Sequence, residues 1–234
     1  MNIEDKNLRK KLIDYLETFV SDERKSTIQR VLGNRTRHIT VVLEDLYQTQ
    51  NISAVLRTCD CYGIQDVHVL QSRNEFEVHK DISMGADKWL TINEYRHDAD
   101  ENNVKTCIDK LHSRGYLVAA TLPDEKRKTI FDIPVEQKVA YLFGTELTGL
   151  SEEAKRLADV NVLIPMYGFT ESFNISNSAA IILSHTSEKL RRSDVDWHLS
   201  EDENEELYFE WLQKSVRDPD AMIRYYFKKN NMEL

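Results

Sequence analysis

Five short β-rich runs alternate with helix-like segments through the middle of the chain, and this alternation constrains the fold more than any other feature. The runs lie at residues 39–43, 66–70, 116–122, 139–143 and 160–164. The helix-like segments lie near residues 51–62, 100–114, 151–158 and 174–191. Strands that alternate with helices form a parallel sheet, because each crossover must return along one face of that sheet. We therefore expect an α/β fold with helices on both faces.

Helical patterns also occupy both ends of the chain. Leu8, Leu12 and Leu16 repeat at every fourth position, which predicts an amphipathic helix. A short helical segment follows at about 22–32, and two more lie near 202–216 and 219–230. The expected organisation is a helical N-terminal extension (1–37), an α/β domain (38–192), and an acidic linker with C-terminal helices (193–234).

Polar and glycine-rich segments follow three of the predicted strands. They read NISAVLR at 51–57, FGTELTGLS at 143–151, and IPMYG followed by SFNIS between 164 and 176. Loops at the carboxyl ends of parallel strands form the ligand crevice of such sheets. No Lys-Ser/Thr pair follows a glycine-rich loop, and no GxGxxG follows the first strand, so ATP and NAD are poor candidates. Without a family to compare, Glu146 is more simply a loop carboxylate near a helix start, and Ser172 and Asn174 are more simply helix caps.

Taken together and in this order, the three segments resemble the motifs of the SpoU, or TrmH-type, RNA 2′-O-methyltransferases. The resemblance covers about residues 38–190. It implies the SPOUT fold, a parallel α/β sheet with a deep C-terminal trefoil knot, and S-adenosyl-L-methionine as cofactor without a metal. The implied cofactor walls are Thr121, Gly144, Ile164 and Phe173. The implied catalytic residues, facing the reacting ribose, are Asn51, Arg57, Glu146, Ser172 and Asn174.

Arg57 and Asn177 raise two questions within that resemblance. Family accounts make the arginine a base, but a guanidinium resists deprotonation in proteins. We therefore hypothesise that Arg57 binds the target phosphate and stabilises charge on the ribose oxygen, with Ser172 and Asn174 holding the hydroxyl. Asn177 departs from the family pattern and places an amide on a helix that we expect to be buried, where it needs a partner.

The resemblance also implies partners. It predicts a homodimer in which Arg57 reaches a site across the two-fold interface. The short terminal extensions favour tRNA as substrate, with guanosine-18 in the D-loop as the methylated position. Methylation of rRNA or of another tRNA position stays open, and so does a catalytically silent RNA-binding protein.

The net charge of −9 argues against nucleic acid until its distribution is considered. Residues 194–210 hold eight acidic groups and no Lys or Arg, whereas residues 24–37 hold basic groups and no acid. A basic, RNA-binding face is therefore possible on an acidic protein, and Arg30, Arg35 and Arg37 are the residues that we expect to form it. Scattered, solvated charge explains the same composition equally well.

Three cysteines, Cys59, Cys61 and Cys107, are too few and too unevenly spaced for a disulfide framework or a zinc site. Since Cys59 and Cys61 are two residues apart, both cannot face the core of one helix. No apolar run reaches membrane-spanning length, and the N-terminus is polar. We expect a cytoplasmic protein with reduced thiols, without metal and without membrane contact.

Overall fold

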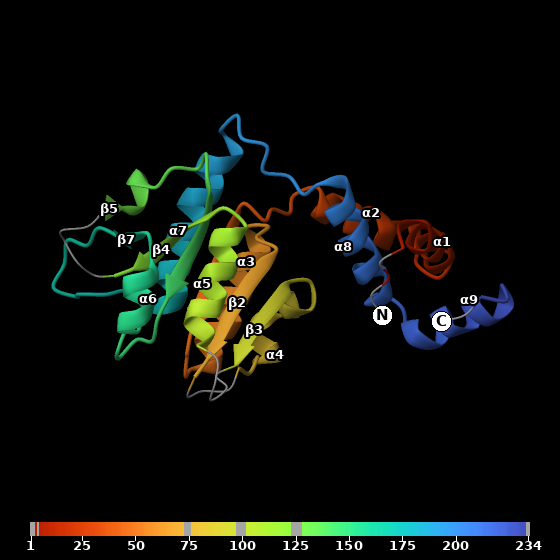
Figure 1. The fold of residues 1–234 in the computed structure, drawn as a ribbon, viewed down its shortest axis with the longest axis horizontal. Coiled ribbons are helices and arrows are strands. Elements are labelled where there is room, and N and C mark those ends of the chain that lie inside the picture. The colour runs from red at the N-terminus through yellow and green to blue at the C-terminus, as the bar shows by residue number, and fades with distance from the viewer. Residues whose placement is uncertain (1–2, 4, 73–75, 97–101, 123–127, 233–234) are drawn as a thin grey trace. The chain divides into compact units, whose positions relative to one another are not determined.

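The computed structural model describes residues 3, 5–72, 76–96, 102–122 and 128–232. The chain forms two compact units. Residues 36–197 make an α/β unit, and residues 1–35 together with 198–234 make a helical unit (Figure 1). The N-terminal and C-terminal segments thus belong to the same helical unit, although the whole α/β unit lies between them in the sequence.

A parallel sheet forms the centre of the α/β unit. In the described part of the chain it has seven strands in the order β3-β2-β1-β6-β4-β7-β5, and every registered pair is parallel. The strands are β1 (Ile39–Glu44), β2 (Asp66–Gln71), β3 (Thr91–Arg96), β4 (Tyr116–Thr121), β5 (Lys128–Thr129), β6 (Lys138–Phe143) and β7 (Val160–Leu163). The predicted parallel α/β architecture is confirmed.

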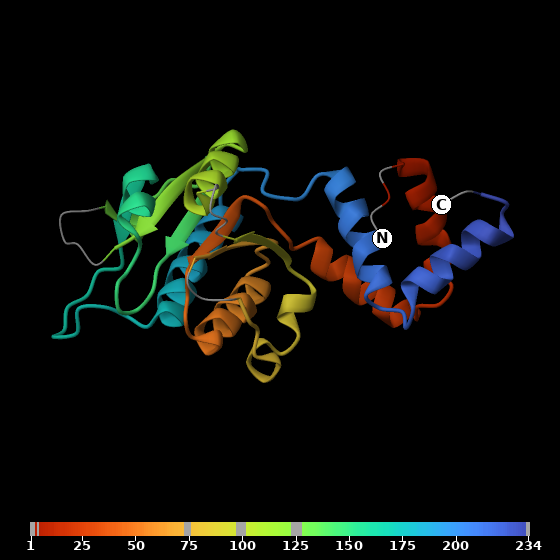
Figure 2. The same cartoon turned by 60° about the horizontal axis from the view of Figure 1, so that its bottom comes forward.

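Helices cover both faces of this sheet (Figures 1 and 2). Ile39, Val41 and Leu43 of β1 pack in one buried cluster with apolar residues of α3 and α7, while Val42 packs in a second cluster with α5 and α6. Alternate residues of a strand point to opposite faces, so two clusters mean two covered faces. The helices of this unit are α3 (Thr49–Cys61), α4 (Lys80–Ser83), α5 (Asn103–Ser113), α6 (Glu152–Leu157) and α7 (Ile175–Arg191), with 3-10 turns at Ala86–Lys88 and Ile130–Asp132.

The structure has two strands that the sequence analysis did not predict, and both lie at edges of the sheet. β3 pairs only with β2, and β5 is a two-residue strand beside β7. β3 reads TINEYR and has no fully buried residue, so its composition gives no apolar run. In β7 only Val162 is buried, because the short β5 leaves the rest of the strand partly exposed.

The helical unit contains all four predicted terminal helices. They are α1 (Lys6–Glu17), α2 (Asp22–Leu32), α8 (Glu201–Gln213) and α9 (Pro219–Lys229). α1 packs against α8 and α9, and α2 packs against α8. The expected stripe on α1 is buried at Leu12 and Leu16, and α8 buries Leu207 and Trp211. Phe209, Trp211 and Phe227 therefore serve the core of this unit, whereas Tyr225 is 58% exposed.

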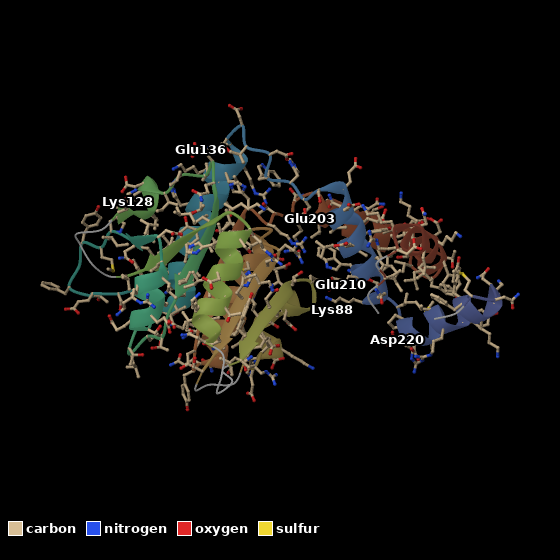
Figure 3. All side chains as sticks on the ribbon, viewed as in Figure 1. Lys88, Lys128, Glu136, Glu203, Glu210 and Asp220 are labelled. Atoms are coloured by element: carbon tan, nitrogen blue, oxygen red, sulfur yellow. The ribbon has the colours of Figure 1, made fainter. Side chains whose placement is uncertain are left out.

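The acidic residues after position 200 belong mainly to a helix and face the basic residues of α1. Arg9 is buried, and its Nε lies 2.9 Å from Glu205 Oε1 while its Nη1 lies 3.3 Å from Glu206 Oε1. Lys6 pairs with Asp202. Glu203 and Glu210 lie on the same helix, α8 (Figure 3). Part of the strong negative charge of this segment is therefore neutralised within the unit, and Arg9, which is buried, needs that pairing.

Candidate functional site

A cavity of about 370 Å³ lies at the carboxyl ends of β4, β6 and β7. Pockets for small organic ligands have volumes of ~300–1,000 Å³, so one such molecule fits. The loop after β6 (144–149) and the segment after β7 (164–173) supply most of its wall. All four residues predicted to contact the cofactor line it: Thr121, Gly144, Ile164 and Phe173. Glu146 and Ser172 line the same cavity.

The loop after β6 is closed tightly upon itself. Thr145 and Gly149 exchange two backbone hydrogen bonds of 3.1 and 3.0 Å, and Gly149 has a left-handed backbone with φ of 69°. A β-carbon on Gly144 would lie 2.3 Å from backbone atoms of Gly149 and Leu150, so only glycine fits there. Gly168, in the segment after β7, has no positive φ and open space around it, so it does not need this freedom.

Three of the predicted catalytic side chains meet in one hydrogen-bonded triangle. Glu146 Oε1 accepts from Asn174 Nδ2 at 2.6 Å and from Asn51 Nδ2 at 3.1 Å. Asn174 Nδ2 also lies 3.1 Å from Asn51 Oδ1. These residues come from three separate segments, namely the start of α3, the loop after β6 and the start of α7. We call these three side chains the amide–carboxylate triangle.

The triangle leaves two polar groups available to a ligand. Asn174 is also the N-cap of α7, since its Oδ1 accepts from Ser176 N at 2.8 Å and from Ser176 Oγ at 2.6 Å. Its amide is therefore fully used inside the protein. By contrast, Glu146 Oε2 and the exposed Ser172 hydroxyl have no hydrogen bond to any residue that the structure describes. Asn174 thus both caps a helix and belongs to the site, whereas Glu146 and Ser172 present the free oxygens.

Arg57 does not join the triangle within one chain. It lies six residues after Asn51 on α3, which places the two side chains ~120° apart around the helix axis. Asn51 is buried, while Arg57 is exposed and does not line the cavity. Its guanidinium has no hydrogen bond or ion pair with a described residue. Within one copy of the chain Arg57 therefore stands apart from the other four predicted catalytic residues, and its expected action across a dimer interface stays a prediction.

The sequence profile of the SpoU rRNA Methylase family matches residues 38–184 of this chain. The chain belongs to that family. It is 40% identical over 208 residues to a tRNA (guanosine(18)-2′-O)-methyltransferase of Borreliella burgdorferi, covering 89% of this chain and 93% of the relative. It is 32% identical to a protein of the same name from Thermus thermophilus, covering 83% and 98% of the two chains.

Solved SpoU-family structures share the fold. The crystal structure of an A. aeolicus TrmH/SpoU tRNA modifying enzyme has a TM-score of 0.74 at 24% identity and covers 84% of this chain and 98% of its own. The SpoU methyltransferase AviRb from Streptomyces viridochromogenes, in complex with the cofactor AdoMet, has a TM-score of 0.58 at 22% identity, with coverages of 69% and 64%. At these identities the likeness establishes the SPOUT-type α/β fold of this chain.

The basic segment of this SpoU-family chain does not form the continuous face that we expected. Arg35 is only 1% exposed, and its guanidinium carbon lies 5.2 Å from the centre of the Trp211 ring, so it cannot reach a phosphate. Arg37 Nε lies 3.0 Å from Asp66 Oδ1, and the side chain is mostly covered. Arg30, in the last turn of α2, is exposed and has no ion pair with a described residue. Arg35 thus packs inside the helical unit, whereas Arg30 is exposed, as an RNA-binding residue must be.

Two further sequence-based expectations have clear outcomes in the structure. Asn177 is exposed, so its amide needs no buried partner. Cys59 is buried and Cys61 is exposed, as predicted from their spacing. In the described ranges there is neither a helix long and apolar enough to span a membrane nor a cluster of three or more metal-ligating side chains.

Apolar side chains near the cavity mouth are strongly exposed, and the sequence analysis did not identify them. Leu147 is 98% exposed and Tyr167 is 97% exposed, and Phe169 is fully exposed. Leu147 lines the cavity, and the two rings belong to the loop between β7 and α7, which extends away from the sheet (Figures 1 and 2). Lys155 and Ile182 also line the cavity without any sequence signal, because they lie on the helices α6 and α7 that follow the motif loops and not in the loops themselves.

Proposed function

We propose that this protein transfers a methyl group from S-adenosylmethionine to the ribose 2′-hydroxyl of guanosine-18 in tRNA. The observation that carries the proposal is the position of Glu146, which lines the cavity and also accepts hydrogen bonds from Asn51 and Asn174. A ligand cavity and a polar triangle thus share one side chain. The names of the two relatives with 40% and 32% identity support guanosine-18.

The cavity has the character that this cofactor needs. Its floor is apolar, with Phe143, Val162 and Ile182, which suits an adenine ring. Its rim is the tight backbone of residues 144–149, where the absence of a β-carbon at Gly144 brings main-chain groups close. When bound, the sulfonium cofactor supplies an electrophilic methyl group. The 144–149 loop itself holds no Lys, unlike a P-loop, and Lys155, which lines the cavity from α6, pairs with Glu152 at 2.8 Å.

The reaction requires the ribose oxygen to be held in line with the methyl carbon and to lose its proton. The C–S bond breaks, a C–O bond forms, and the hydroxyl proton leaves. We assign the holding of the hydroxyl to Ser172 Oγ and to Glu146 Oε2, the two unoccupied oxygens of the site, with Glu146 as proton acceptor. Asn51 and Asn174 orient that carboxylate through its other oxygen. This assignment replaces the expected role of Asn174 as a direct ligand of the hydroxyl.

We also propose that the active form is a homodimer in which Arg57 completes the partner's site. Arg57 faces away from its own triangle, so it can stabilise the target phosphate and the developing oxyanion only from another copy. The exposed Leu147, Tyr167 and Phe169 give this end of the unit an apolar surface that a two-fold contact would cover.

The path of the chain after β7 supports the trefoil knot implied by the family resemblance, and we include the knot in the proposal. β7 lies beyond β4 in the sheet, yet the helix that follows it, α7, packs against α3, which follows β1. The chain must therefore return past β4 and β6 before α7 begins. Ordinary folds avoid connections that cross in this way.

For tRNA binding we propose exposed cations of the helical unit. Arg224, Lys228 and Lys229 of α9 are exposed, and their side chains have no ion pair with a described residue. Arg224 and Lys228 are four residues apart, so they lie on one helix face. Together with Arg30 they are the proposed phosphate contacts. A tRNA substrate also assigns the protein to the cytoplasm.

The test is incubation with labelled S-adenosylmethionine and unmodified tRNA, followed by nucleotide analysis for 2′-O-methylguanosine. A matched tRNA that already carries 2′-O-methylguanosine at position 18 is the control, and rRNA is offered in parallel. We expect one methyl group per unmodified tRNA and none on the control. Methylation of both tRNAs, or of rRNA alone, contradicts the assignment to guanosine-18, and no transfer to any RNA contradicts the enzymatic function.

A further inference from the structure

Glu44 is a buried acidic residue that none of the recognised motifs contains. It is the last residue of β1, in the middle of the sheet, and is 5% exposed. Its Oε2 accepts a hydrogen bond from the backbone N–H of Ser151 at 2.9 Å. These two residues are 107 positions apart. A buried carboxylate is costly without such partners, so its position calls for a specific explanation.

The start of α6 supplies that explanation. Ser151 is the N-cap of α6, and its Oγ accepts from Ala154 N at 3.1 Å. In an ordinary capping box the side chain of the third helical residue bonds back to the N-cap N–H. Here that residue is Ala154, which has no acceptor. Glu44 of β1 occupies the vacant acceptor role from another part of the fold.

The helix α8 shows the ordinary arrangement in the same chain. Ser200 is its N-cap, Glu203 N donates to Ser200 Oγ at 3.3 Å, and Ser200 N donates to Glu203 Oε2 at 2.9 Å. The two caps make the same pair of hydrogen bonds. They differ in that α6 takes its carboxylate from the sheet, which ties the end of the 144–151 loop to the end of β1.

We propose that Glu44 is a positioning residue that fixes both loops bearing the amide–carboxylate triangle. Immediately after Glu44 the chain turns sharply, since Asp45 has a left-handed backbone with φ of 52°, and it then leads to Asn51 on α3. The loop that Glu44 holds at Ser151 begins at Gly144 and contains Glu146. One side chain thus determines the separation of the segments that present Asn51 and Glu146, and it holds a wall of the cavity as well.

The experiment compares Glu44→Ala, Glu44→Gln and Glu203→Ala in the full-length protein. Glutamine keeps a side-chain oxygen that can accept from Ser151 N, whereas alanine removes it. Glu203→Ala removes the same kind of cap bond from the helical unit and serves as the matched control. The readouts are methyl transfer to tRNA, calorimetric binding of S-adenosylhomocysteine, and hydrogen exchange of the backbone amides from 145 to 151.

We expect Glu44→Ala to slow methyl transfer by on the order of 10–100-fold, because misplacement by about 1 Å has effects of that size. We also expect it to weaken S-adenosylhomocysteine binding and to speed exchange at Ser151. Glu44→Gln should come close to the wild-type protein in methyl transfer, in S-adenosylhomocysteine binding and in exchange at Ser151. Glu203→Ala should leave methyl transfer and S-adenosylhomocysteine binding unchanged. Wild-type behaviour of Glu44→Ala, or a Glu44→Gln protein no better than Glu44→Ala, overturns the inference.

The rate readout rests on the proposed function, but the other two readouts do not. If wild-type protein methylates no RNA, the proposed function fails, while binding and hydrogen exchange still test Glu44. If Glu44→Ala is too unstable to purify, Glu44→Gln compared with Glu44→Asp replaces it. Aspartate keeps the carboxylate but is one methylene shorter, so it should reproduce the faster exchange at Ser151, and wild-type exchange in Glu44→Asp overturns the inference.

Discussion

Asn174 donates a 2.6 Å hydrogen bond from its Nδ2 to Glu146 Oε1, and this contact joins the start of α7 to the loop after β6. The two residues are 28 positions apart. Because Glu146 also lines the cavity, the contact connects a helix cap to the ligand site. Disturbing either the loop or the cap should therefore affect the chemistry.

Gly144→Ala should abolish cofactor binding, and Gly168→Ala should not. A β-carbon at position 144 would overlap backbone atoms at 2.3 Å, so the loop must move away from its cavity-lining position. At position 168 a β-carbon meets nothing within 4 Å. We expect methyl transfer to fall by on the order of 100-fold in Gly144→Ala alone. Calorimetry with S-adenosylhomocysteine measures binding, and equal binding by both variants contradicts the assignment of this cavity.

Arg57→Ala should abolish methyl transfer while cofactor binding persists, since Arg57 does not line the cavity. The loss should be on the order of 10²–10³-fold, as for other groups that stabilise a developing oxyanion. Arg57→Lys should stay severely impaired at alkaline pH, because lysine lacks the forked donors of a guanidinium. Recovery of activity as pH rises would show instead that a base is missing at this position.

Mixing Arg57→Ala with Asn174→Ala protomers should restore activity if Arg57 acts across a dimer interface. After random exchange about half of the dimers are mixed, and each mixed dimer holds one intact site, so about a quarter of the sites should be active. Each variant alone is the inactive control. Light scattering reports the dimer mass. No restoration after verified exchange, or a fully active monomer, contradicts action in the partner's site.

Charge reversal at Arg30 and Lys228 should weaken tRNA binding and leave S-adenosylhomocysteine binding unchanged. Each lost phosphate contact should reduce the slope of log affinity against log salt by about 0.7–0.9. Lys105→Glu is the control, because Lys105 already pairs with Asp109 on α5. Arg35→Glu, in contrast, should destabilise the helical unit, since Arg35 is buried beside Trp211. Equal tRNA affinity of the reversed and control proteins would place the RNA surface elsewhere.

The free energy of unfolding should fall as the pH drops from about 6.5 toward 4, in part because of His68. Burial lowers the pKa of His68 from 6.5 to about 4, with smaller effects from Lys110 and Arg114. In that window the unfolded chain binds the proton and the folded chain does not, so the contribution is full above pH 6.5 and is lost on acidification. A shift of this size corresponds to at most ~3 kcal/mol.

His68→Gln should reduce that pH dependence, and His198→Gln, at an exposed position, should not. Urea unfolding at a series of pH values measures the slope. His38 has a pKa lowered by burial as well, so part of the dependence should persist in His68→Gln. Identical slopes for the two variants contradict the assignment to His68.

Local patterns in the sequence were enough to predict most elements and the edge of the sheet at which the cavity lies. Apolar runs and the spacing of apolar residues along helices predict five strands and eight helices, and the resemblance to the SpoU family implies the four residues that line the cavity, Thr121, Gly144, Ile164 and Phe173. This succeeds because parallel strands bring their carboxyl ends to one edge of a sheet, so order along the chain already implies proximity. The edge strands β3 and β5 were not predicted, because their sequences lack an apolar run.

Only the tertiary structure decided which polar residues are used inside the protein and which remain free. A sequence gives Arg35 and Arg30 the same chemistry, but packing buries one beside Trp211 and leaves the other in solvent. The tertiary structure likewise separates Arg57 from the triangle, and it brings Glu44 next to Ser151, which is 107 positions away in the sequence. Such outcomes depend on side-chain contacts between distant segments, whereas periodicity reports only on neighbours along one helix or strand.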